Sequence, residues 1–305
     1  MFLRLNNKAA MIFKPQHYIN CNGRILSLEK PKIMAILNLT PDSFYDGGRW
    51  TDKNILNRVE EMLAEGADII DIGAMSSKPG ADFISLEQEM ERLISPLKAI
   101  LKEFPEIIIS IDTWRSEIVK AVHLEGAHII NDISAGNLDD NLFETVASSG
   151  MPYVLMHMQG TPQNMQQKPN YEDICTELLG FFIQKLEKLR KAGIKDIVLD
   201  PGFGFGKTLD HNYELLAGLH NFKMLELPIL AGVSRKSMIC RLLECKPDNA
   251  LNGTTALHML CLEKGAKILR VHDVKEAAEA IKIWNLYNLK SSNATFLQNN
   301  ASLHQ

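Results

Sequence analysis

The chain has 305 residues, 46% of them hydrophobic, and a formal net charge of -4. This length and apolar content suffice for one large core, and the negative charge excludes the broad basic surface typical of nucleic-acid-binding proteins. No apolar run approaches the ~18 residues that span a membrane. The first residues, MFLRLNNKAAM, are too polar for a secretory signal.

The cysteines indicate a reducing compartment. There are five of them, and none forms a CxxC pair: Cys21, Cys175, Cys240, Cys245 and Cys261. An odd, scattered set fits neither a disulfide framework nor a zinc knuckle. We expect a cytoplasmic protein that binds neither membrane nor nucleic acid.

Short apolar runs recur along the chain, and most end at a polar residue. They occupy residues 33–37, 67–73, 107–111, 128–130, 152–156, 196–199, 228–233 and 267–269. Segments between them, such as 54–65 and 177–191, have apolar residues every three to four positions and predict helices. Several of these segments end at a glycine that suits a helix C-terminus, namely Gly66, Gly126, Gly193 and Gly265.

This alternation predicts a closed (β/α)8 TIM barrel, with a doubly wound open sheet as the alternative. The Asn22-Gly23 pair lies between apolar pairs and predicts a β-hairpin, which we expect to close the bottom of the barrel. We divide the chain into an N-terminal segment with the hairpin at 1–32, a single barrel domain at 33–289, and a polar, disordered tail at 290–305.

Polar residues at the strand ends indicate a binding site. Asp112, Asn131 and Asp200 each follow an apolar run. A barrel brings the C-terminal ends of its strands to one mouth, where two carboxylates and an amide suit a flat, donor-rich heterocycle. For any one of the three alone, a helix N-cap is the better interpretation, and only the set of three favours a binding site. Lys236 and Arg270 add positive charge to the same mouth.

The end of the last strand indicates a phosphate group, and the first strand is followed by a polar loop. His272 follows Arg270 by two residues and shares its side of an extended strand. Loops after the seventh and eighth barrel strands often hold phosphate. The polar stretch 38–48 is either a functional loop or a capped turn. His157 is a weaker candidate for the mouth.

Metal ligands are sparse in the sequence. Neither an HExxH motif nor a cluster with zinc-ligand spacing is present. A Mg²⁺ ion held mainly by substrate phosphates and one side-chain oxygen remains compatible with the pattern.

The glycine-rich stretch 200–208 matches neither phosphate-binding motif that it resembles. A P-loop requires glycine where Pro201 stands, and a dinucleotide fingerprint requires glycine where Lys207 stands. The stretch is therefore a strand-ending carboxylate followed by a loop with Phe203 and Phe205. These two rings are either flat walls of a ligand site or core residues of a tight turn.

Seven motifs together resemble the dihydropteroate synthase family. In the family's order, between about residues 33 and 285, they read ILNLTPDSFYDGG, SIDTWR, INDISAG, MHMQGTP, DPGFGFGKT, GVSRKS and RVHDV. The resemblance implies a TIM-barrel transferase, active as a homodimer, that makes 7,8-dihydropteroate and pyrophosphate in folate biosynthesis. Its substrates would be 6-hydroxymethyl-7,8-dihydropterin diphosphate and 4-aminobenzoate.

The resemblance also implies residue roles. The pterin would be bound by Asp112, Asn131, Asp200, Lys236 and Arg270. The diphosphate would be held by Asn38, Ser77, Arg270 and His272, with Asn38 also binding Mg²⁺. The 4-aminobenzoate pocket, where sulfonamides compete, would be bordered by Ser77, Lys78, Pro79, Phe205 and Ser234.

The second loop departs from the family pattern. The usual Glu-Ser-Thr-Arg-Pro-Gly reads Met-Ser-Ser-Lys-Pro-Gly at 75–80. Ser77 keeps a hydroxyl, Lys78 keeps the charge but loses the bidentate fork, and Met75 removes a carboxylate. A weakly active or inactive pterin-binding paralogue is therefore one alternative. A pterin-dependent methyltransferase barrel is another, although the first loop argues against it.

Overall fold

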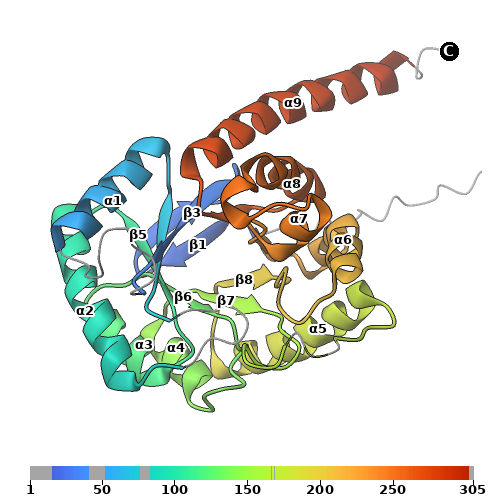
Figure 1. Cartoon of the computed structure of the whole chain (residues 1–305). Coiled ribbons are helices and arrows are strands. Elements are labelled where there is room, and N and C mark those ends of the chain that lie inside the picture. Colours follow the sequence, from blue (N-terminus) through green and yellow to red (C-terminus); the bar gives the residue numbers. More distant parts are fainter. Residues whose placement is uncertain (1–15, 41–51, 76–82, 166, 168, 302–305) are drawn as a thin grey trace, which may run out of the picture.

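The computed structural model describes residues 16–40, 52–75, 83–165, 167 and 169–301. Within these residues, eight strands form one parallel sheet in the order β8-β7-β6-β5-β4-β3-β10-β9. A parallel bridge between Leu199 and Ile229 joins its two edges, so the sheet closes into a barrel (Figure 1). The predicted (β/α)8 barrel is confirmed, and the open sheet is wrong.

Each apolar run of the sequence overlaps one strand. The strands are β3 (Lys32–Asn38), β4 (Ile69–Gly73), β5 (Ile108–Asp112), β6 (Ile129–Asp132), β7 (Tyr153–Met156), β8 (Ile197–Asp200), β9 (Leu230–Ala231) and β10 (Ile268–Val271). β9 is shorter than its apolar run because Pro228 has no N–H for the ladder and the chain turns away after Ala231.

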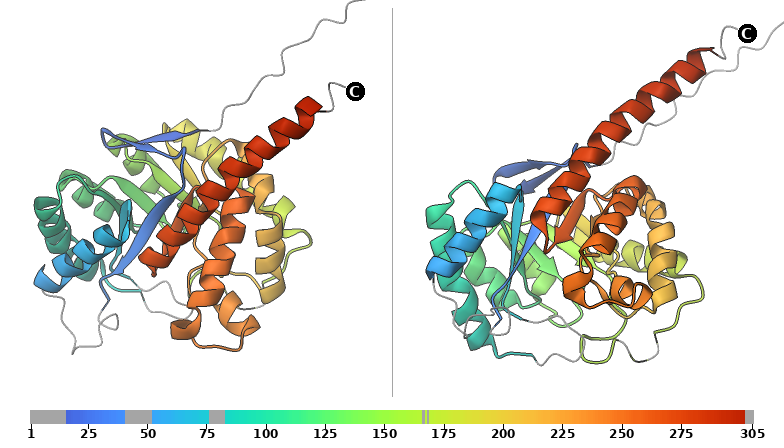
Figure 2. Two further views of the ribbon diagram at one scale, coloured as in Figure 1. Left: turned by 90° about the horizontal axis from the view of Figure 1, so that it is seen from above. Right: turned by 45° about the horizontal axis from the view of Figure 1, so that its top comes forward.

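The helices surround the barrel, as Figure 2 shows from two directions. They are α1 (Asp52–Glu65), α2 (Leu86–Glu103), α3 (Ser116–Leu124), α4 (Leu142–Ser149), α5 (Ile174–Ala192), α6 (Leu209–Ala217), α7 (Ser237–Leu242), α8 (Leu251–Lys264) and α9 (Val274–Ala301), with 3-10 turns η2 (Leu219–Leu225) and η3 (Pro247–Asn249). The four glycines predicted to end helices all have φ between 96° and 110°, which confirms the left-handed stop.

The N-terminal hairpin closes the bottom of the barrel. β1 (Tyr18–Cys21) and β2 (Arg24–Ser27) pair antiparallel, and the turn residues Asn22 and Gly23 have φ of 52° and 88°. Four hairpin-segment side chains pack on one buried residue from every barrel strand; the cluster contains Ile19, Cys21, Leu26, Leu28, Met34, Ile69, Ile108, Ile129, Val154, Val198, Leu230 and Ile268. This layer is entirely apolar.

The C-terminal helix is longer than the sequence analysis expected. α9 continues through Ala301, beyond the boundary placed at residue 289, and extends past the barrel helices (Figures 1 and 2). No glycine or proline follows Gly265, so nothing in this segment breaks the helix. Among the helices described, none combines the length and the apolar character needed to cross a membrane.

Candidate active site

Strand register places the polar side chains of the mouth on one level. Asn38 pairs with Gly73, Gly73 with Asp112, and Asp112 with Asn131. A Cβ at Gly73 would lie 3.5 Å from Asn38 Oδ1 and 3.4 Å from Asp112 Cβ. The glycine therefore leaves room for the two neighbouring side chains to approach each other over β4.

Arg270 crosses the floor of this mouth and binds two carboxylates. Its Nε donates to Asp71 Oδ2 at 2.7 Å, and a terminal nitrogen donates to Asp112 Oδ2 at 3.0 Å. Asn131 Nδ2 donates to the same Asp71 oxygen at 3.0 Å. These bonds fix the plane of the guanidinium, which then faces the space above it as a flat cation.

Asp71 was not among the residues selected from the sequence. It is fully buried, and within the described part of the chain its Oδ1 has no hydrogen-bond partner. The signal was its position inside the otherwise apolar run ADIIDIG, because a carboxylate in a buried strand requires a partner. Sequence reasoning examined only strand ends and therefore missed it.

The charged groups of the mouth have shifted pKa values. Burial raises the pKa of Asp112 to about 7, against the opposing charge of Arg270 and with a contribution from Asp71. Burial also raises the pKa of Asp200. Burial lowers the pKa of Lys236 to about 8, although Asp200 opposes this change. Burial thus opposes the charge of each of these three groups, and a neighbouring group of opposite charge supports it.

The loop after β8 brings Lys236 against an aromatic ring. Lys236 Nζ donates to the Phe203 carbonyl at 2.6 Å and lies 4.0 Å from the centre of the Phe205 ring. Asp200 Oδ1 accepts a bond from the Gly202 N–H at 2.8 Å. Phe205 is 8% exposed beside Lys236, whereas Phe203 is fully buried in the large core outside the barrel. Of the two candidate walls, only Phe205 adjoins the mouth.

Ser234 and His272 meet at the rim. The Ser234 hydroxyl accepts a bond from the His272 backbone N–H at 3.2 Å and lies 3.1 Å from its Nδ1. Although part of His272 is exposed, loss of water around its ring and the positive charges of Arg270 and Arg235 lower its pKa to about 4. The ring is therefore neutral at pH 7 until an anion binds beside it.

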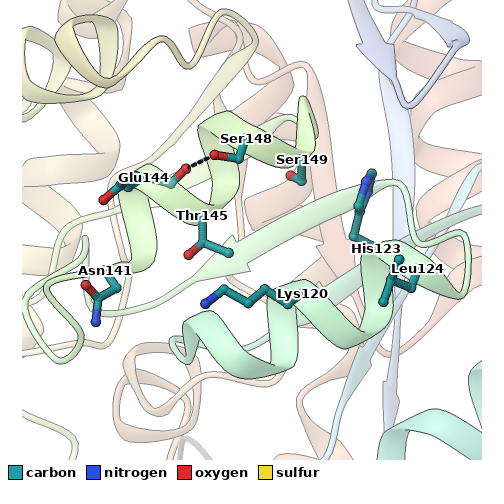
Figure 3. A pocket seen from close by; sticks show the side chains of 8 residues that line it. All are labelled: Lys120, His123, Leu124, Asn141, Glu144, Thr145, Ser148 and Ser149. Atoms are coloured by element: carbon teal, nitrogen blue, oxygen red, sulfur yellow. Dashed lines mark hydrogen bonds between the residues drawn. The ribbon is translucent and has the colours of Figure 1, made fainter.

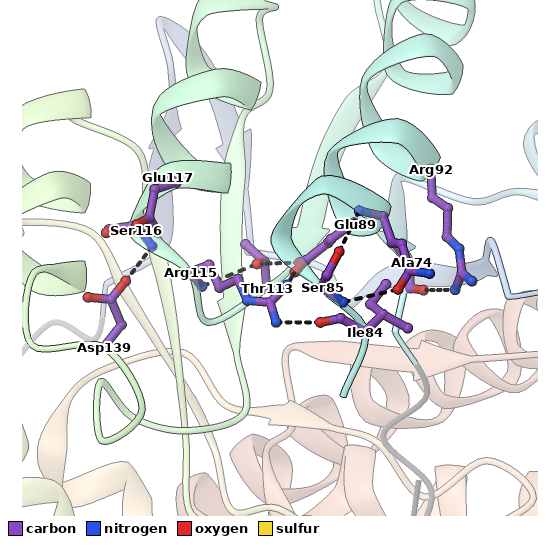
Figure 4. Close-up of polar contacts among 11 residues, drawn as sticks. Ala74, Ile84, Ser85, Glu89, Arg92, Thr113, Arg115, Ser116, Glu117 and Asp139 are labelled. Carbon is purple, nitrogen blue, oxygen red and sulfur yellow. Dashed lines mark hydrogen bonds and ion pairs between the residues drawn. The ribbon is translucent and has the colours of Figure 1, made fainter. Parts of the chain in front are cut away.

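The second loop lies partly outside the described residues. Three predicted binding residues, Ser77, Lys78 and Pro79, lie outside the described residues. The described chain on each side of them is held by an arginine. Arg92 donates to the Ala74 carbonyl at 3.0 Å, and Arg115 donates to the Ile84 carbonyl at 2.6 Å (Figure 4).

A buried carboxylate supports this arrangement. Glu89 of α2 is fully buried and accepts bonds from Thr113 at 2.7 Å and from Arg115 at 2.6 Å (Figure 4). Burial raises the pKa of Glu89, while the Thr113 bond and the charge of Arg115 oppose the rise. The start of α2 and the loop after β5 are thereby joined.

A magnesium ion fits the residues of the first strand end. The described residues contain no group of three His, Cys, Asp or Glu side chains arranged to hold a metal. A Cβ at Gly73 would lie 3.5 Å from Asn38 Oδ1 and 3.7 Å from Asp112 Oδ2, so both oxygens adjoin the same backbone position. Such a small oxygen set suits Mg²⁺ that takes most of its ligands from a bound diphosphate and water.

His157 is buried and bonded to a lysine of the glycine-rich loop. It is 7% exposed, and its Nδ1 accepts a bond from Lys207 Nζ at 3.1 Å. Burial and the charge of Lys207 lower the pKa of His157 to about 2, so the ring is neutral. His157 is thus bonded to Lys207 of the glycine-rich loop.

A surface groove of about 470 Å³ lies elsewhere, between α3 and α4 (Figure 3). Its lining residues are Lys120, His123, Leu124, Asn141, Glu144, Thr145, Ser148 and Ser149. None of the predicted site residues belongs to it. The chemistry is concentrated at the barrel mouth instead.

Comparison with known proteins identifies the family to which the chain belongs. Residues 34–272 match the family model described as pterin binding enzyme. The chain is 45% identical to the dihydropteroate synthase of Escherichia coli over 266 residues, covering 86% of this chain and 93% of the relative.

Solved structures give the same relationship. The Yersinia pestis dihydropteroate synthase in complex with a sulfonamide drug has a TM-score of 0.85 and 41% identity, covering 89% of this chain and 99% of that one. The Xanthomonas albilineans dihydropteroate synthase with 4-aminobenzoic acid has a TM-score of 0.84 and 36% identity, covering 89% and 98%.

Proposed function

Because the chain belongs to the family of pterin-binding enzymes, we propose that it is a dihydropteroate synthase of folate biosynthesis. It would join 6-hydroxymethyl-7,8-dihydropterin diphosphate to 4-aminobenzoate and release pyrophosphate. The observation that carries the proposal is the Arg270 guanidinium, fixed by Asp71 and Asp112 beside Asn131 in a mouth that also contains Lys236.

Pterin recognition follows from the donors and acceptors of the mouth. Asp112 and Asp200 would accept hydrogen bonds from the amino and N–H edge, and Asn131 offers an amide to the same ring. Lys236 would donate to a ring acceptor. Arg270 is planar and would stack on the bound heterocycle.

The diphosphate would lie toward β3 and β10. Arg270 and His272 would contact it, and Asn38 would hold Mg²⁺ against it; the metal would neutralise part of the leaving group's charge. His272 is neutral before binding, and the diphosphate would favour its protonated form. Charge fixed in advance at the leaving group lowers the barrier to bond cleavage.

Reaction would begin with loss of pyrophosphate, giving a cationic pterin methylene group. The arylamine nitrogen of 4-aminobenzoate would then attack that carbon and lose its proton to solvent. Phe205 and Ser234 would border the aminobenzoate together with Ser77, Lys78 and Pro79, and sulfonamides would compete for this pocket.

Two further properties are proposed. A homodimer is supported by exposed apolar side chains on the last helices, including Leu242, Leu260 and Ile283. Sedimentation at equilibrium tests it.

A cytoplasmic location is supported by the five cysteines, all free thiols.

The decisive experiment measures pyrophosphate release from the pterin diphosphate with Mg²⁺, with and without 4-aminobenzoate. We expect dihydropteroate and pyrophosphate in equal amounts when both substrates are present. Absence of release under both conditions would overturn the catalytic proposal. Pterin binding by calorimetry without any turnover would identify an inactive pterin-binding protein.

A further inference from the structure

Lys207 is one of the most deeply buried charged residues of the mouth region, although no catalytic role falls to it. It is 2% exposed. Its Nζ donates to the Gly202 carbonyl at 2.8 Å, to the Phe205 carbonyl at 3.0 Å and to His157 Nδ1 at 3.1 Å. A fourth acceptor, the His157 carbonyl, lies 3.4 Å from the same nitrogen, so all three N–H donors of the ammonium have partners.

These bonds hold a loop that lacks a backbone ladder. Gly202, Gly204 and Gly206 all have positive φ, at 70°, 82° and 60°. A Cβ at Gly202 would collide with the His157 carbonyl, and one at Gly206 would lie 2.5 Å from the carbonyl of Gln159. The loop is therefore pressed against the chain after β7, where its carbonyls need buried donors.

The same loop forms one side of the proposed ligand site. In sequence, Phe203 lies between Gly202 and Phe205, whose carbonyls bind Lys207. The Phe203 carbonyl accepts a bond from Lys236 Nζ at 2.6 Å. The Phe205 ring lies 4.0 Å from the same Lys236 ammonium. A Cβ at Gly204 would lie 3.0 Å from Lys236 Cδ, so the backbone also approaches this lysine closely.

From this geometry we propose that Lys207 is a positioning residue. Its ammonium ties the Gly202 and Phe205 carbonyls to His157, and thereby presents the Phe203 carbonyl and the Phe205 ring to Lys236. The inference rests on the proposed synthase activity for its kinetic readout. Lys207 touches neither substrate.

The acceptors around Lys207 favour its ammonium form, whereas burial disfavours it. Burial lowers its pKa to about 7, opposed by the charge of Asp200 and assisted by that of Lys236. The neutral His157 ring offers Nδ1 as an acceptor. Within the described residues Lys207 forms no salt bridge within 4.0 Å, so its bonds to neutral acceptors are what fix its place.

A double-mutant cycle with Phe205 tests the proposal. We expect Lys207→Met to raise KM for 4-aminobenzoate at least about 10-fold and to weaken binding of 6-hydroxymethylpterin in calorimetry. In a Phe205→Ala background the same change should alter KM less than about 2-fold, because the ring to be positioned is gone. Leu28→Ala, which weakens the bottom of the barrel, is the control for stability loss alone and should leave both readouts unchanged.

Several results would overturn the proposal. One is a KM for Lys207→Met within 2-fold of the wild type. Another is an effect of the same size in the Phe205→Ala background, which indicates a general structural role. If Lys207→Met does not fold, Lys207→Gln, which keeps two N–H donors, replaces it; failure of both to fold would assign Lys207 to folding alone.

The proposed function is tested separately by the wild type. A wild type that binds 6-hydroxymethylpterin but forms no dihydropteroate contradicts the synthase activity and leaves the calorimetric test of Lys207 in place. A wild type that forms product while Lys207→Met binds the pterin normally and keeps its KM contradicts only the positioning role.

Discussion

At the bottom of the barrel, Leu28 and the hairpin pack on an apolar residue from each strand. At the mouth, Asp71 is buried on β4 only two residues beyond Ile69 of that apolar layer, and it is bonded to Arg270. The bottom thus gains stability from burial of apolar surface. The mouth keeps charges in a place where they are costly unless each finds a partner. The bottom of the barrel therefore contributes stability, whereas the mouth provides groups for recognition whose burial lowers stability.

The largest effect is expected from breaking the ion pair at the mouth. Arg270→Ala should lower kcat/KM by at least about 10³-fold and the free energy of unfolding by about 3–5 kcal/mol, since Asp71 would stay buried without a cation. Enzyme kinetics and urea unfolding measure the two losses. The double variant Asp71→Asn with Arg270→Ala should regain stability but not activity; regained activity would contradict the proposed role of Arg270.

The next effect should be confined to the bottom. Leu28→Ala removes a fully buried side chain and should cost about 2–5 kcal/mol of unfolding free energy, with kcat/KM of the folded enzyme unchanged. Ile25→Ala, on the same hairpin but 65% exposed, is the matched control and should change stability by less than about 0.5 kcal/mol. A large kinetic effect of Leu28→Ala would show that the two ends are coupled.

A stability gain is expected from neutralising Asp112. Its pKa is raised in the folded state from 3.8 to about 7, so its contribution to stability is present below pH 4 and is lost as the pH rises to 7. Asp112→Asn should therefore match the wild type near pH 4 and exceed it above pH 7 by up to about 4 kcal/mol. Thermal unfolding across this range measures it, and equal stability at pH 8 would refute the buried-charge explanation.

A smaller effect should come from the departing second loop. Lys78→Arg restores the bidentate fork of the family pattern. We expect it to lower KM for 4-aminobenzoate or for the pterin diphosphate about 3- to 10-fold, which corresponds to about 1 kcal/mol. Steady-state kinetics with each substrate varied in turn decide the matter. Unchanged KM values would mean that Lys78 already serves the substrates as well as arginine.

The smallest effect concerns His272. Its pKa of about 4 in the free protein should rise when pyrophosphate binds, because the anion favours the charged ring. Calorimetry at pH 6 in two buffers of different ionisation enthalpy should detect uptake of a fraction of a proton. The variant His272→Asn should lose this uptake, and uptake that survives the substitution would place the proton elsewhere.

Most of the fold could be predicted from the sequence, because apolar runs, glycine stops and the Asn-Gly turn are local signals. The sequence indicated eight strands and the hairpin, but not the two-residue length of β9 or the continuation of α9. The length of β9 depends on Pro228, which has no N–H for the ladder beside β8. The continuation of α9 depends on the absence of helix breakers in a polar segment. Composition alone did not distinguish such a segment from a disordered tail.

The site was predictable where residues stand at strand ends, and less so behind them. Asp112, Asn131 and Arg270 share one bonded network, as a common barrel mouth implies. Asp71 was not selected because its partners, Asn131 and Arg270, are distant in sequence. Lys207 was not selected because two of its partners are backbone carbonyls, which have no signature in the residue types. A buried charge inside an apolar run is the signal that would have identified Asp71.

The seam of the barrel has a consequence for motion. Neighbouring strands such as β4 and β5 pair over five residues, whereas β8 and β9 are joined by the single Leu199–Ile229 bridge and a bond from the Leu199 N–H to the Pro228 carbonyl. Local opening costs least where the fewest hydrogen bonds break. The amide of Leu199 should thus exchange with solvent sooner than the amides that join β4 to β5, and the local opening it reports would occur next to Asp200, where the heterocycle is expected to enter.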